Sequence, residues 1–195
     1  MSADPDATSG GAPDLLSHFW APLTAVGSHN ASGRPNAQIC VAVFGASIVP
    51  ERPRLLVVLH RTNLTHDLVA ESGTLAITLL SEEQLALLEP LGLRSGRDGE
   101  KLDGLALRTT AAGDPIFLGG VGYLACEVLD AADLGDATAY LVAVRERASL
   151  GDAAAAGAPM RWASARQRLG APFLDRWAQK SAREQEAARA AMRWR

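Results

Sequence analysis

The stretch "VGYLACEVLDAADLGDATAYLVAVRERASL", residues 121–150, decides the fold class of this chain. It consists of two β-prone segments, 121–135 and 137–150, which meet at the Gly135–Asp136 pair. Runs rich in Val, Leu, Tyr and Ala that end at turn residues are typical of strands. No helical segment separates the two, which argues against a doubly wound sheet, where strands and helices alternate.

Shorter β-prone segments precede this stretch. They are "AQICVAVFGASIV" (37–49), "RLLVVLH" (54–60), "TLAITLL" (74–80), "LALRTT" (105–110) and "PIFLGG" (115–120). Helical patterns at 63–73 and 81–92 lie between some of them. With roughly six or seven strands separated by turn signals, the sequence favours an antiparallel barrel or sandwich. The predicted class is therefore mainly β (α+β), with inserted helices.

The two ends of the chain differ in composition from its centre. Residues 1–13 are rich in small residues and lack the basic start and apolar stretch of a signal peptide, so we expect a disordered leader and a cytoplasmic protein. Residues 151–195 are rich in Ala, Arg, Glu and Gln, which favour helices. We therefore expect a domain over 14–150 and a helical C-terminal extension. One face of the last helix there forms a largely apolar stripe that must pack on the barrel or on a second subunit. Its residues are Leu174, Trp177, Ala178, Ser181, Ala188 and Met192.

Composition and charge exclude several classes of protein. The 195 residues, 48% of them hydrophobic, suit one domain with an extension, and no run reaches the ~18 apolar residues of a membrane span. The net charge of −3 divides into +5 from Gly151 onward and −8 before it. The basic residues of the tail alternate with Ala, Glu and Gln, so we expect helix surfaces and no nucleic-acid partner.

Cysteine and histidine usage argues against a disulfide framework and a metal site. Cys40 and Cys126 both lie in apolar runs, which is typical of buried thiols in a reducing compartment. The four histidines are scattered along the chain, so we expect no metal ligand set.

A polar stretch, "HRTNLTHDLV" (60–69), follows the apolar run at 54–59. If a helix begins near Thr62, its first amide hydrogens have no backbone partners and its dipole favours an anion there. Arg61 adds a fork of donors suited to phosphate, and Thr62, Asn63 and Thr65 add short donors. The alternative is that Thr62 merely caps the helix and Arg61 is solvated. This stretch alone does not favour either interpretation.

A second stretch, "GRPNAQICVAVF" (33–44), begins with small and polar groups and becomes apolar. Its backbone could lie along a flat ligand. Asn36 and Gln38 can both donate and accept, as the edge of a pyrimidine-like ring requires. The alternative is a hairpin strand whose polar end lies in solvent.

Five motifs follow one another in a recognisable order. They are "NAQICVAVF" (36–44), "PERPRLLVVL" (50–59), "RTNLTH" (61–66), "GDPIFLGGVGYLACEV" (113–128) and "LGDATAYLVAVRE" (134–146). In this order they resemble the flavin reductase-like proteins, which are FMN-binding split-barrel domains. The resemblance covers roughly residues 15–150 and leaves the basic helical tail outside.

The resemblance implies a six-stranded antiparallel split β-barrel that forms a homodimer, with FMN near the subunit interface. It places the flavin ring against Asn36, Ala37, Gln38, Ile39 and Cys40. It places the phosphate and ribityl chain at Arg61, Asn63 and Thr65, with Thr62 beside them.

The implied activity is that of a flavin-dependent oxidoreductase, an NAD(P)H:flavin (FMN) reductase that passes hydride to flavin N5. NADH or NADPH would be the co-substrate, and a partner monooxygenase or another acceptor would take the electrons. The flavin carries the chemistry of such a flavoprotein, so no catalytic side chain is expected. "GVGYLA" (120–125) loosely fits a dinucleotide fingerprint, but a strand-like segment follows it instead of a helix, so we reject that interpretation.

One departure from the family pattern concerns the nicotinamide. Many members have a histidine after the Gly-Asp pair, where this chain has Ala137. We therefore expect NADH oxidation with a raised KM, in which Arg94, Arg97 and Lys101 of a polar loop hold the nucleotide's pyrophosphate. The alternatives are that this loop is simply solvated, and that the protein is an FMN-binding electron-transfer or storage module without a nicotinamide site.

Overall fold

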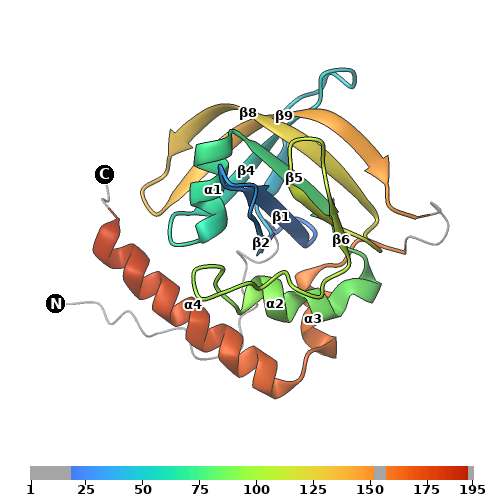
Figure 1. The fold of residues 1–195 in the computed structure, drawn as a ribbon. Helices are drawn as coiled ribbons and strands as arrows, with labels where there is room; N and C mark the ends of the chain where they lie inside the picture. Colours follow the sequence, from blue (N-terminus) through green and yellow to red (C-terminus); the bar gives the residue numbers. More distant parts are fainter. Residues whose placement is uncertain (1–18, 152–156, 193–195) are drawn as a thin grey trace.

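The structure is a computed structural model that describes residues 19–151 and 157–192 (Figure 1). The predicted leader over 1–13 lies outside these residues. The chain forms a seven-stranded antiparallel sheet in the order β2-β1-β5-β8-β9-β4-β3 and a two-stranded sheet of β6 and β7. The large sheet consists of β1 (Thr24–His29), β2 (Pro35–Cys40), β3 (Val43–Gly45), β4 (Arg54–His60), β5 (Thr74–Leu79), β8 (Gly122–Asp133) and β9 (Ala137–Ser149), and the small one of β6 (Leu107–Thr109) and β7 (Pro115–Phe117).

The predicted strands at 121–135 and 137–150 form the long antiparallel pair β8 and β9, which runs from Gly122 opposite Ser149 to Asp133 opposite Thr138. Two shifts of register interrupt this pair, between Ala125 and Cys126 and near Val128. Such bulges increase local twist and bend, and Figure 1 shows the sheet curled into an open half-barrel. The mainly antiparallel barrel is confirmed, with seven strands in its large sheet, where the resemblance implied six. "GVGYLA" leads into β8, in agreement with the rejected fingerprint.

Helices lie outside the barrel at three places in the chain. Helix α1 (Leu64–Ser72) connects β4 to β5, and Gly73 ends it in the left-handed conformation with φ of 69°. A 3-10 helix (Glu82–Leu87) leads into the short α2 (Leu88–Gly92). The C-terminal part forms α3 (Trp162–Arg168) and the long α4 (Ala171–Ala191), which runs diagonally below the barrel in Figure 1. None of the helices in the described residues is long and apolar enough to cross a membrane.

Two apolar clusters hold these elements together. The first fills the barrel and includes Val57, Leu75 and Val142. The second lies between the barrel and the C-terminal helices and includes Leu88, Phe117, Met160, Ala165 and Phe173. Burying a side chain such as Phe173 contributes about 1.5–3 kcal/mol, so these contacts hold the C-terminal part against the barrel.

The apolar stripe predicted on the C-terminal helix packs on its own domain. Leu174 and Trp177 contact the second cluster. The ring of Trp177 lies 4.8 Å from that of Trp162, centroid to centroid, and 5.9 Å from that of Phe173. Upstream of α3, Met160 donates its N–H to the Leu80 carbonyl at 2.9 Å and accepts from Leu23 at 2.8 Å. The structure therefore shows the first of the two alternatives, in which the stripe packs on the barrel of its own chain.

Candidate functional site

A cavity of about 560 Å³ opens between the barrel edge and α4. Strand β2 forms one wall, and the turn from β4 into α1 forms another. The end of α2, the loop 94–101 and the inward side of α4 complete the cavity. Among the strands of the described residues, β2 pairs only with β1, so the other edge of β2 has no strand partner there.

Seven of the nine predicted cofactor-binding residues line this cavity. They are Asn36, Gln38, Ile39, Cys40, Thr62, Asn63 and Thr65. Ala37 instead lies fully buried in the second apolar cluster. Arg61 is half-exposed, and its Nη2 lies 2.8 Å from Oδ1 of Asp133, away from the lining residues. A ligand role for these nine residues remains a prediction.

A buried hydrogen bond connects the two predicted stretches. Asn36 on β2 donates from Nδ2 to Thr65 Oγ1 on α1 at 2.8 Å. Gly96 of the polar loop packs against the same amide: a Cβ at position 96 would come within 2.2 Å of Asn36 Oδ1. The Asn36 amide is therefore held in place from two sides.

Gln38 carries an unpaired acceptor at the cavity wall. The residue is 8% exposed, and among the described residues its Oε1 is the only buried side-chain polar atom without a hydrogen-bond partner. An unsatisfied buried acceptor costs about 1–3 kcal/mol. The atom is therefore suited to accept a hydrogen bond from an N–H or O–H group of a ligand.

The start of α1 faces the same space. The helix begins at Leu64 with Asn63 at the N-cap, two residues later than the sequence suggested, so Thr62 does not cap it. The Asn63 side chain makes no capping hydrogen bond. The His66 N–H donates to the Asn63 carbonyl at 3.1 Å. The amides of Leu64 and Thr65 before it, together with the helix dipole, suit an anion beside Thr62 and Asn63.

Three cationic side chains also line the cavity. These are Arg94 and Lys101 of the polar loop and Lys180 of α4. Lys101 is 8% exposed, and its Nζ donates to the Arg94 carbonyl at 3.2 Å. Burial, helped by the nearby charge of Lys180, lowers the pKa of Lys101 to about 8. Arg97, the third cation predicted in this loop, pairs instead with Asp67 at 2.6 Å.

Cys40, which lines the cavity, is not an activated nucleophile. Burial raises the pKa of the Cys40 thiol to about 11, against a smaller lowering by the Ala42 amide. Its Sγ donates to the Val58 carbonyl at 3.6 Å. The thiol is therefore protonated at neutral pH, which suits a site where a bound group carries the chemistry.

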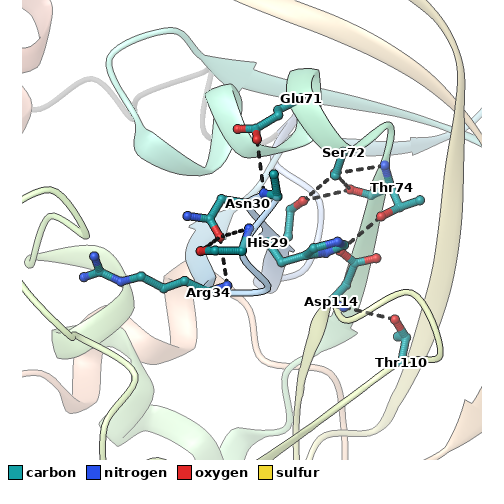
Figure 2. A network of polar contacts seen from close by, with 11 residues as sticks. His29, Asn30, Arg34, Glu71, Ser72, Thr74, Thr110 and Asp114 are labelled. Atoms are coloured by element: carbon teal, nitrogen blue, oxygen red, sulfur yellow. Dashed lines mark hydrogen bonds and ion pairs between the residues drawn. The ribbon is translucent and has the colours of Figure 1, made fainter.

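Outside the cavity, a polar network surrounds His29 and Asp114 (Figure 2). His29 Nδ1 lies 2.8 Å from Asp114 Oδ1, which also accepts from Thr74 Oγ1 at 3.2 Å. Ser28 Oγ lies 2.9 Å from Ser72 Oγ and donates to the Thr74 carbonyl. Since these hydroxyls face each other and the backbone, the network ties β1 to the β6–β7 loop and does not form a nucleophilic triad.

Sequence reasoning missed the contribution of α4 to the cavity. Trp177, Lys180, Ser181, Glu184, Gln185 and Ala188 all line it. The apolar stripe was the available signal, because Trp177, Ser181 and Ala188 belong to it, but its partner could not be identified from the sequence. His60 and Asp136 also line the cavity, with His60 Nδ1 3.7 Å from Asp136 Oδ2.

Comparison with protein families gives one match over most of the chain. The family model described as flavin reductase like domain matches residues 16–170. The high molecular weight rubredoxin of Moorella thermoacetica is 27% identical over 132 residues, which cover 67% of this chain and 55% of that protein. The ferric-chelate reductase (NAD(P)H) of Archaeoglobus fulgidus is 28% identical over 113 residues, which cover 57% of this chain and 66% of that protein. The chain thus spans between half and two thirds of these relatives.

Solved structures share the fold. The nitrilotriacetate monooxygenase component B of Mycobacterium thermoresistibile superimposes with a TM-score of 0.63 at 22% identity, covering 71% of this chain and 74% of that one. An FMN-binding protein from Thermus thermophilus superimposes with a TM-score of 0.63 at 21% identity, covering 76% of this chain and 80% of that one. The NADH:FAD oxidoreductase of Streptomyces globisporus superimposes with a TM-score of 0.63 at 18% identity, covering 69% of this chain and 79% of that one.

Proposed function

The chain belongs to the flavin reductase like domain family, and we propose that it is an NAD(P)H-dependent flavin reductase with FMN in the cavity beside β2. The observation that carries this proposal is the unpaired, buried Oε1 of Gln38, a residue that lines the cavity. The pyrimidine edge of a flavin presents an N–H donor between two carbonyl acceptors. Gln38 can accept from that N–H, and the fixed amide of Asn36 lies two residues away on the same strand.

The start of α1, which the Asn36–Thr65 hydrogen bond joins to β2, suits the flavin's phosphate. The uncapped first turn of α1 offers backbone amides, with Thr62 and Asn63 beside them. A phosphate at a helix start is stabilised by these donors and by the dipole. The residues present therefore fit FMN: an acceptor for the ring edge, an apolar strand edge for the ring, and donors for the phosphate.

When bound, the flavin supplies the hydride-accepting centre, and the chain supplies binding, orientation and exclusion of water. Trp20, Val41 and Trp177 give the cavity apolar walls. No side chain needs to act as acid or base, which agrees with the protonated thiol of Cys40.

The nicotinamide site rests on the groups near the cavity mouth. Ala137, which occupies the position of the family histidine, lies directly opposite His60 in the β4–β9 ladder. The imidazole of His60 is exposed and lines the cavity, next to Asp136. His60 can therefore offer a ring nitrogen to the nicotinamide amide from the neighbouring strand. NADH and NADPH are both candidates for the co-substrate.

Anaerobic spectroscopy tests the proposal. The purified protein, or the protein supplied with FMN, should show the yellow absorption of a bound flavin, and NADH or NADPH should bleach it. A protein that binds FMN but is bleached by neither nucleotide would instead be an FMN-binding electron-transfer or storage module, the alternative that the absence of a histidine at position 137 favours. A protein that takes up no flavin would contradict both readings.

We further propose a homodimer that hands electrons to a partner monooxygenase or another acceptor. The edge strand β3 and the loop after it expose Phe44, Ile48 and Val49, and Ile48 is 99% exposed. Apolar groups beside an open sheet edge favour pairing with another chain. Light scattering at micromolar concentration should give twice the mass of the chain, and a monomeric mass would contradict the dimer.

A further inference from the structure

Helix α4 brings a charged pair into the cavity from outside the family domain. The family match ends at residue 170, and α4 begins at Ala171. Lys180 and Glu184, one helical turn apart, form an ion pair on the side of α4 that lines the cavity. They are about a quarter and two fifths exposed, respectively, so the cavity wall shields the lysine in part.

Lys101 shows that the charge in this region is incompletely balanced. Its ammonium is almost fully buried and has three donors, but its one hydrogen bond among the described residues goes to a neutral carbonyl, that of Arg94. Lys180 opposes the charge of Lys101, and Glu184 supports it from a distance. A buried cation without a direct counter-ion is costly, so this part of the cavity favours an incoming anion.

We propose that Lys180 and Lys101 form a binding subsite for a phosphate or diphosphate group, and that Glu184 occupies Lys180 until the anion arrives. The chain thus carries its own internal competitor for the ligand on α4. The inference rests on the proposed function for the identity of the ligand, which is either the phosphate of the flavin or the pyrophosphate of the nicotinamide nucleotide.

Substitutions of Lys180 and of Glu184 should have opposite effects on the affinity for the anion. Lys180→Gln removes a cation from the subsite, so anion affinity should fall about five- to tenfold, as for loss of a partly shielded charged hydrogen bond. Glu184→Gln removes the competing carboxylate and frees Lys180, so affinity should rise about two- to fivefold. A pair that only stabilised the helix would change the melting temperature in both variants and leave affinity unchanged.

Helix α4 also provides a matched control. Arg189 and Glu186 form an ion pair on the same helix, at 3.2 Å, and neither lines the cavity. Arg189→Gln and Glu186→Gln change the net charge of α4 by the same amounts as the test variants. They should leave the affinities unchanged.

The experiment titrates all five proteins with FMN, riboflavin and inorganic pyrophosphate, followed by tryptophan fluorescence, and measures the KM for NADH. If Lys180→Gln weakens binding of FMN but not of riboflavin, the subsite holds the flavin phosphate. If it leaves both flavins unchanged but raises the KM for NADH, the subsite holds the nucleotide's pyrophosphate. Affinities that match the controls in every arm, or that shift in the same direction in both test variants, overturn the proposal.

The pyrophosphate arm separates this inference from the proposed function. A wild-type protein that binds no flavin refutes the function, but the inference still requires that it bind pyrophosphate more tightly than Lys180→Gln does. A wild-type protein that binds and reduces flavin, with Lys180→Gln identical to Arg189→Gln, refutes only the inference.

Discussion

Gly92 at the end of α2 lies so close to Trp177 of α4 that a Cβ at position 92 would come within 2.6 Å of the indole Cζ3. Only a residue without a side chain lets α4 lie this close to α2, and both residues line the cavity. The position of the cavity wall formed by α4 therefore depends on a glycine in a different helix.

Replacing this glycine should move α4. Gly92→Ala forces the indole aside, and overpacking of this kind costs about 1–3 kcal/mol of unfolding free energy, although alanine is the better helix former. Flavin affinity should fall as well, because the wall shifts. Gly45→Ala is the control, since nothing lies within 4 Å of a Cβ there. Urea unfolding and flavin titration check both effects, and an unchanged midpoint would show that α4 is not held at this contact.

Gln38 should separate ligand binding from stability. Gln38→Met removes the unpaired acceptor, so flavin binding should weaken by about 1–3 kcal/mol while the fold stays as stable or becomes more so. Gln84 is equally buried, but its amide accepts from the Ser81 N–H and donates to the Leu118 carbonyl. Gln84→Met should therefore lose stability. Equal losses of stability in the two variants would argue against a ligand role for Gln38.

Thr65 should matter through its hydroxyl. Thr65→Val leaves Asn36 Nδ2 buried without its acceptor, at a cost of about 1–3 kcal/mol of unfolding free energy. Thr65→Ser keeps the oxygen and should recover most of that loss. Thermal unfolding of the two variants makes the comparison. If Thr65→Val is as stable as the wild type, the hydrogen bond from Asn36 does not contribute to stability.

The pKa of Lys101, lowered to about 8, predicts opposite pH dependences for binding and for folding. Below about pH 8 the ammonium is charged and attracts phosphate, so the affinity for FMN or NADH should fall between pH 7 and pH 9. The groups near it are Arg94, Lys180 and Glu184. Folding stability should rise from about pH 8 toward the usual lysine pKa of 10.5, because the unfolded chain then binds the extra proton. Lys101→Met should abolish both dependences.

Arg61 tests the phosphate contact predicted from the sequence. Its guanidinium pairs with Asp133 at the barrel surface, so it must leave that carboxylate to reach a ligand. If it does so, Arg61→Ala should weaken FMN binding by about 1.5–3 kcal/mol and leave riboflavin binding unchanged. Equal affinities of wild type and variant for FMN would remove Arg61 from the site.

Local sequence patterns predict much of the secondary structure of this protein. The alternation and turn residues of 121–150 required two long neighbouring strands, because their β-prone side chains and the Gly135–Asp136 turn favour no other local structure. The polar groups at 36–38 and 62–65 had to lie at the end of one strand and the start of another element, and seven of the nine predicted residues line one cavity. The strands and the turn depend on short-range preferences, which a sequence carries in full, whereas the set of nine site residues came from the resemblance to the family.

Other features depended on which segments meet in space. Contacts between residues far apart in the chain decide three of them. These are the ion pair of Arg61 with Asp133, the close approach of α4 to Gly92, and the burial of Lys101. A glycine at 92 or a lysine at 101 reads as an ordinary surface residue until another element packs against it. The tertiary structure alone decided that the apolar stripe of α4 covers its own barrel. The stripe packs there against an apolar cluster assembled from distant segments, and no local sequence pattern identifies that cluster.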